Sequence, residues 1–94
     1  MDTFTVVFVL RAPPGFDGAA LERLPLHDEG LRLWHDDADP TVLRGSVDCS
    51  ADDLDGALAV GRELARKTAA ALHLAVEEVA AMDDESQLVW RANP

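Results

Sequence analysis

Residues Ser50 to Leu72 read SADDLDGALAVGRELARKTAAAL and carry the clearest helix pattern in the chain. From Leu54 onward, apolar residues recur at spacings of three and four, as on one face of an α-helix. Ser50 is the expected N-cap, with Asp53 at the capping-box spacing. The apolar side of this helix also carries small residues, which would let it lie close on a sheet: Ala57, Gly61, Ala65 and Ala69.

The segments around this helix predict strands. Thr3 to Arg11 has apolar residues at both alternating positions, which indicates a central strand. Further strands are expected at Leu31 to His35, Thr41 to Cys49 and Gln87 to Arg91. Leu74 to Met82 fits either a strand or a continuation of the helix, and we expect a strand that returns parallel beside the first one. A short helix is expected from Gly18 to Leu24, capped by Asp17 and ended by Pro25.

The two strands on either side of the turn at Asp37 to Asp39 allow a prediction of register. Leu31 and Leu33 should share a face with the apolar residues of the next strand, because a slip of one residue would place them in water. The pairing that we expect sets Leu33 opposite Leu43, Trp34 opposite Val42, Arg32 opposite Arg44 and Gly45 opposite Leu31.

This order of elements predicts one α+β domain over residues 1–94. It is the order of a ferredoxin-like split β-α-β sandwich, βαββαβ with an extra C-terminal strand. An antiparallel sheet would then carry two helices on one of its faces. Such an architecture hosts many unrelated functions, so it predicts no chemistry by itself.

Composition restricts the classes of partner. The net charge of −10 argues against general binding to nucleic acid or to anionic membranes, which needs a surplus of basic residues. Cys49 is the single cysteine and cannot form an internal disulfide, so a reducing, cytoplasmic location is expected. The apolar run that starts at Phe4 is too short to span a bilayer and lacks the basic flank of a signal peptide.

The sheet face without helices is the candidate binding surface. Arg32 and Arg44, placed opposite each other, would repel, so an anion is expected nearby. An acid of the same chain (Asp48, Glu77 or Glu78) is the more common explanation, and a carboxylate or phosphate on a small ligand or partner is the other. The surface is predicted to consist of Val7, Val9, Arg32, Trp34, Val42 and Arg44, with Arg11 at its margin.

Two functions follow from this surface. The first is a non-catalytic binding domain that docks a protein partner, with self-association through the open face as the expected mode. The alternative is a small enzyme or a metabolite-sensing domain, without cofactor, that has a pocket at the sheet face or at a dimer interface. Its residues to test would be His35, Arg32, Arg44 and Trp34.

Other chemistry has weaker support. The cluster His35-Asp36-Asp37-x-Asp39 has ligand types for a metal, but it lacks the glycine and the closing glutamate of a calcium loop. We therefore expect no metal site and no cofactor. Cys49 is not expected to act as a nucleophile, because the aspartates of the following helical turn oppose formation of a thiolate.

Overall fold

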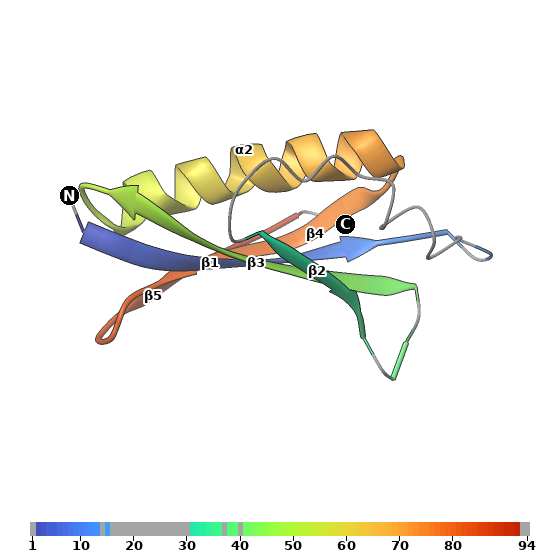
Figure 1. The fold of residues 1–94 in the computed structure, drawn as a ribbon, viewed down its shortest axis with the longest axis horizontal. Helices are drawn as coiled ribbons and strands as arrows, with labels where there is room; N and C mark the ends of the chain where they lie inside the picture. The colour runs from blue at the N-terminus through green and yellow to red at the C-terminus, as the bar shows by residue number, and fades with distance from the viewer. Residues whose placement is uncertain (1, 14, 16–30, 37, 40, 93–94) are drawn as a thin grey trace.

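The computed structural model describes residues 2–13, 15, 31–36, 38–39 and 41–92. They form five strands and one helix, and the helix lies across one face of the sheet (Figure 1). The elements are β1 (Asp2–Arg11), β2 (Arg32–His35), β3 (Val42–Ala51), α2 (Leu54–Leu72), β4 (Ala75–Met82) and β5 (Gln87–Arg91). The expected helix at Gly18 to Leu24 lies outside the described residues, so the predicted pair of helices is not confirmed. The α+β class is confirmed.

The strand order across the sheet is β2-β3-β1-β4-β5, and every neighbouring pair is antiparallel. The prediction of a strand at Leu74 to Met82 is confirmed by β4, but the expected parallel pairing with β1 is wrong. Helix α2 connects β3 to a strand that runs in the same direction as β3. Because β1 lies between these two strands and is antiparallel to β3, it is also antiparallel to β4.

Helix α2 begins later than the sequence predicts. Ser50 is not its N-cap, because β3 continues through this residue and pairs it with Thr3. Asp53 caps the helix instead, and its carboxylate accepts a hydrogen bond from the backbone N–H of Gly56 at 2.7 Å. At the other end His73 adopts the left-handed conformation with φ 58°.

The small residues of α2 face the sheet, as the pattern predicts. Ala57, Gly61, Ala65 and Ala69 are all buried. At Gly61 the helix comes so close to the sheet that a Cβ atom would clash with the side chain of Val6. The core between the two layers also contains the largest fully buried side chains of the described chain, Phe8, Leu10, Leu43, Val6 and Val79.

The register between β2 and β3 differs from the prediction by two residues. Trp34 pairs with Arg44 rather than with Val42, and Arg32 pairs with Ser46 rather than with Arg44. Pairing continues past β2, since the N–H of Asp36 donates to the carbonyl of Val42 at 2.9 Å. Leu33, not Leu31, therefore lies opposite Gly45. A shift of two keeps every side chain on the expected face but changes all of its neighbours.

Strand β4 contains an irregularity that affects the outer face. Its pairing with β1 jumps between Val9 and Leu10, so that Glu77 is the extra residue of a β-bulge. Beyond Met82 the turn is closed by Asp83, whose carboxylate accepts hydrogen bonds from the N–H groups of Glu85 at 2.8 Å and Ser86 at 2.6 Å. The short strand β5 then pairs with β4, as predicted.

Candidate interaction surface

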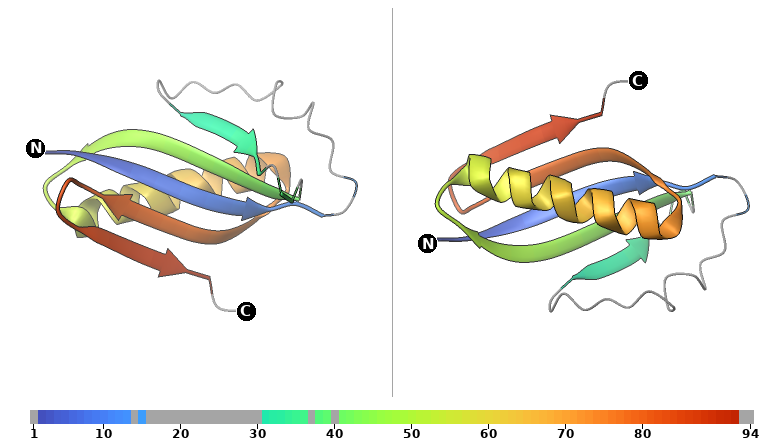
Figure 2. Two further views of the ribbon diagram at one scale, coloured as in Figure 1. Left: turned by 90° about the horizontal axis from the view of Figure 1, so that it is seen from below. Right: turned by 90° about the horizontal axis from the view of Figure 1, so that it is seen from above.

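The sheet has two unlike faces, which Figure 2 shows from opposite sides. Even-numbered residues of β1, from Phe4 to Leu10, are buried under α2, whereas Thr5, Val7 and Val9 are half-buried on the other side. Among the described residues, no helix covers that second side. We define the open face as the odd-numbered residues from Thr5 to Arg11 together with the residues that pair with them across the sheet.

Two of the exposed large apolar side chains of the described chain lie on the open face. Trp34 is 42% exposed and Val89 is 38% exposed, and they stand on the outer strands β2 and β5. Between them, Val7 pairs with Ala80, which in turn pairs with Val89. An apolar strip therefore runs from Val7 on β1 to Val89 on β5, whereas on β3 the open-face residues between β1 and β2 are the polar Arg44 and Ser46. Val89 was not among the predicted site residues, although its alternation with Leu88 and Trp90 could have placed it on this face.

The structure describes all six predicted surface residues. Arg32 and Trp34 are exposed, while Val7, Val9 and Arg44 are half-buried. Val42 is only 8% exposed and adds little to the accessible surface. Its partner in the register is Arg11, whose long side chain lies at the same end of the face.

Arg11 is held by acids from two different segments. Its Nε donates to Glu77 at 2.9 Å and its Nη1 donates to Asp39 at 3.2 Å. The hydrogen bond to Glu77 and the charge of that carboxylate raise the pKa of the Arg11 guanidinium above its ordinary value. Two hydrogen bonds from Thr41, one from its hydroxyl and one from its N–H, lower the pKa of Asp39, and Arg11 lowers it further.

Two further arginines of the open face, Arg44 and Arg91, also contact acids of the same chain. Arg44 donates from Nε to Asp36 at 3.3 Å, and Arg91 donates from Nε to Glu78 at 2.8 Å. The predicted like-charge pair of Arg32 and Arg44 does not exist, so it gives no argument for an external anion. The acid beside Arg44 is none of the three that the sequence suggested, because the shifted register brings Asp36 next to it instead.

One row of residues crosses the whole open face. Trp34 pairs with Arg44, Arg44 with Val9, Val9 with Glu78, and Glu78 with Arg91. We call these five residues the central row. It has an apolar residue in the middle, opposite charges on either side of that residue, and an aromatic residue and a cation at its two ends. Sequence reasoning named Glu78 only as a candidate acid and did not place Arg91 on this face, because both positions depend on the antiparallel pairing of β4 with β1 and β5.

Among the residues of the expected enzyme alternative, the structure places Trp34 directly beside Arg44 on the open face. The register pairs His35 with the core residue Leu43, whereas Trp34 pairs with Arg44 in the central row. In the part of the chain that the structure describes, no three side chains of metal-ligand type form a cluster. Cys49 lies on the helix side, and burial, followed by the charge of Asp48, raises the pKa of its thiol. A raised pKa disfavours the thiolate that a nucleophile requires.

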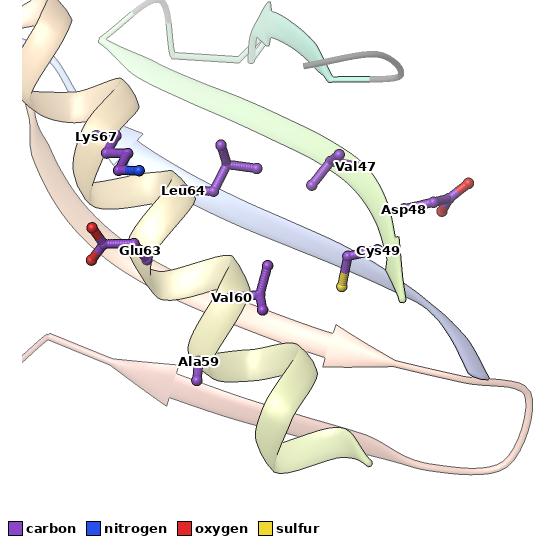
Figure 3. A pocket seen from close by; sticks show the side chains of 8 residues that line it. All are labelled: Val47, Asp48, Cys49, Ala59, Val60, Glu63, Leu64 and Lys67. Atoms are coloured by element: carbon purple, nitrogen blue, oxygen red, sulfur yellow. The ribbon is translucent and has the colours of Figure 1, made fainter. Parts of the chain in front are cut away.

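A groove of about 550 Å³ lies on the helix side, between α2 and β3 (Figure 3). Val60 and Leu64 border it from the helix, and Val47 and Cys49 border it from the strand. Its charged groups are Asp48, Glu63 and Lys67. The helix residues that border this groove lie on the opposite side of the sheet from the central row, and Asp48, which pairs with Thr5 of the open face, is shared by the two surfaces.

No protein-family model, curated protein or solved structure matches this chain. Within the described residues, no helix combines the length and the apolar character needed to cross a membrane.

Proposed function

We propose that this protein is a small, acidic, non-catalytic interaction domain that self-associates through the open face. The observation that carries the proposal is that the open face exposes two large apolar side chains, Trp34 (42%) on β2 and Val89 (38%) on β5, the latter at the end of the apolar strip. Exposed apolar patches of this kind mark sites of protein association more often than free surface. We propose a second copy of the chain as the partner, because of the charge of the open face.

The open face is much less acidic than the chain as a whole. Four of the eight basic residues of the sequence, Arg11, Arg32, Arg44 and Arg91, lie in its strands. Acids such as Glu77 and Glu78 balance them, and several of these groups form ion pairs. Two chains with a net charge of −10 each repel at long range. A nearly neutral face is the surface on which they can approach most closely.

The polar groups of the open face also support binding rather than catalysis. Arg11, Arg44 and Arg91 point their donors at neighbouring carboxylates. A sheet face whose charged groups are already paired with one another suits a protein partner, whereas catalysis uses enclosed sites with convergent polar groups. We propose a cytoplasmic location for the domain.

For the architecture, we propose the ferredoxin-like βαββαβ arrangement with β5 as the added strand. The crossover from β3 through α2 to β4, with β1 between the two strands, is one half of that arrangement and supports it. The other half falls on residues 16–30, outside those described. Backbone chemical shifts of residues 18–24 would test it, since non-helical values would contradict the arrangement.

Sedimentation velocity tests the self-association. We expect the wild-type chain to sediment as a dimer at tens of micromolar and to dissociate on dilution. Val89→Asp should abolish the dimer, because it places a charge in the apolar strip. Val60→Asp is the matched control, since Val60 is similarly exposed (47%) but lies on α2. A monomeric wild type, or equal behaviour of the two variants, would overturn the proposal.

A further inference from the structure

The central row carries opposite charges on the two sides of strand β1. Val9 stands in its middle, with Arg44 on β3 to one side and Glu78 on β4 to the other. Beyond these, the row ends in Trp34 on β2 and Arg91 on β5. In such a row, each group on one side of Val9 can face a complementary group from the other side of a second copy. The surface can therefore bind a copy of itself in one orientation, with a two-fold axis through the centre.

A two-fold axis that runs along β1, between two facing sheets, exchanges the two sides of the row. It places β3 of one copy over β4 of the other, and β2 of one copy over β5 of the other. From this geometry we infer that two copies pack with their β1 strands facing, so that Arg44 of each meets Glu78 of the other. This inference rests on the proposed self-association and adds the orientation of the partner.

The other members of the row become complementary in the same orientation. Val9 meets Val9 of the second copy on the axis, in an apolar contact. Trp34 of one copy lies over Arg91 of the other, and a guanidinium over an indole ring is a favourable cation–π pair. The same chain already contains such a pair on its helix side, where Arg62 lies 4.5 Å from the ring centre of Trp90.

The charged groups of the row have bonding capacity left for a partner. The contact of Arg44 with Asp36 uses Nε, and the contact of Glu78 with Arg91 uses Oε1. A guanidinium has four further N–H donors and a carboxylate has a second oxygen. The side chains of Arg44 and Glu78 are 42% and 35% exposed, so both are accessible from outside the sheet.

The opposite orientation is unfavourable for this row. In that orientation the two-fold axis runs parallel to the central row, between the two facing sheets, and it would place Arg44 over Arg44 and Glu78 over Glu78. Like charges brought together at an interface oppose association, and complementary charges fix the register of the partner. Within the central row, the charge pattern therefore favours the axis along β1.

The size of the face is sufficient for a reversible dimer. Five strands at about 4.8 Å spacing and a length of about 25 Å, less at the short outer strands, give roughly 500 Å² of flat area per copy. Stable interfaces bury about 600–1,000 Å² of accessible surface per partner, and a pleated face with side chains exceeds its flat area. We therefore expect association at about micromolar concentrations.

Charge reversal tests the orientation. In Arg44→Glu, both contacts of the dimer bring two acids together, and in Glu78→Arg both bring two bases together. Each variant alone should therefore self-associate at least about tenfold more weakly than wild type.

Mixing the two variants restores opposite charges at both contacts. At one contact, the acid introduced at position 44 of the first variant meets the base introduced at position 78 of the second. At the other contact, the unchanged Glu78 of the first variant meets the unchanged Arg44 of the second. The mixed dimer should therefore recover to within about threefold of the wild-type dissociation constant.

The mixing step separates the inference from a folding defect, since an unfolded variant is not rescued by a second variant. Lys67→Glu on α2 serves as the control and should self-associate like wild type. If the wild-type dimer is sensitive to Val89→Asp but the mixture stays monomeric, the orientation is wrong and the proposed function stands. If wild type is monomeric or insensitive to Val89→Asp, both fail.

Discussion

The ring of Phe8 on β1 packs directly against the backbone of Gly45, its partner on β3. The ring occupies the space that a side chain at position 45 would need, and Phe8 is fully buried there. A glycine in the middle of a strand contributes no side-chain packing of its own. At position 45 it leaves the space that the buried ring of Phe8 fills.

Replacing Gly45 with alanine should destabilise the fold. The new Cβ would clash with the Phe8 ring, and core overpacking of this kind costs about 1–3 kcal/mol. The free energy of unfolding from urea titration measures the loss. Ser46→Ala is the control on the same strand but on the open face, and it should change stability by less than about 0.5 kcal/mol. A neutral Gly45→Ala would show that the ring does not lie where the structure places it.

Gly61 should also resist substitution, although it lies inside a helix. Alanine gains about 1 kcal/mol of helix propensity over glycine, but its Cβ would clash with Val6, so we expect a net loss of about 1 kcal/mol. The double variant Val6→Ala/Gly61→Ala removes the clash. Its loss of unfolding free energy should therefore be smaller than the sum of the two single losses, whereas strict additivity would contradict the contact.

His73 offers a stabilising change. It adopts the left-handed conformation after α2, and its N–H bonds back to the carbonyl of Ala70 at 3.3 Å. Glycine adopts this conformation without strain, so His73→Gly should raise the unfolding free energy by about 0.5–1 kcal/mol after its extra freedom in the unfolded chain is counted. Thermal unfolding at neutral pH measures the gain. His73→Ala keeps a residue with a Cβ atom in the left-handed conformation, so it should not show this gain in unfolding free energy.

Stability should depend on pH through Asp39. Its hydrogen bonds from Thr41 hold its pKa below the ordinary value, so its contribution is fully present above about pH 4 and is lost as the pH falls through the lowered pKa. Asp39→Asn should therefore be less stable than wild type near neutral pH, and the gap should narrow as the pH falls below the ordinary aspartate pKa and through the lowered one. Urea midpoints across this range measure it. A gap that stays constant would contradict the assignment.

Trp34 should report the association directly. The chain has two tryptophans and no tyrosine, so Trp90→Phe leaves Trp34 as the only indole. As the concentration rises through the dimer range, the emission of this variant should shift to shorter wavelength, because the partner excludes water from the ring. The variant Trp90→Phe/Val89→Asp should show no shift. A shift in both variants would place the association elsewhere on the molecule.

Alternation along the strands predicted the two faces of the sheet correctly but not the neighbours within each face. The pattern of Leu31, Leu33, Leu43 and Val47 distinguishes even shifts from odd ones, and it does not choose among even shifts. The actual register is shifted by two residues relative to the predicted one, so that Asp36 lies opposite Val42. That choice depends on turn geometry and on the fit of Phe8 over Gly45, which no local pattern contains.

For the candidate site too, the alternation predicted the face on which a residue lies but not its neighbours on that face. The pattern placed Val7, Val9, Trp34 and Arg44 on one face because an even shift leaves faces unchanged. It missed the ion pair of Arg44 with Asp36, and it did not place Glu78 and Arg91 beside Val9, because these positions depend on the registers of β2 with β3, of β1 with β4 and of β4 with β5. The early end expected for β3 had a similar cause, since pairing with β1 extends the strand to Ala51.

The outer strands of the sheet are short: β2 has four residues and β5 has five, against ten in β1 and in β3. A neighbouring molecule that tried to lengthen the sheet sideways would gain only a few backbone hydrogen bonds from either border. Fibril-like growth is therefore discouraged by the outline of the sheet, while its broad surface stays accessible. A chain with this sheet can form a dimer through its open face without adding further molecules at its strand edges.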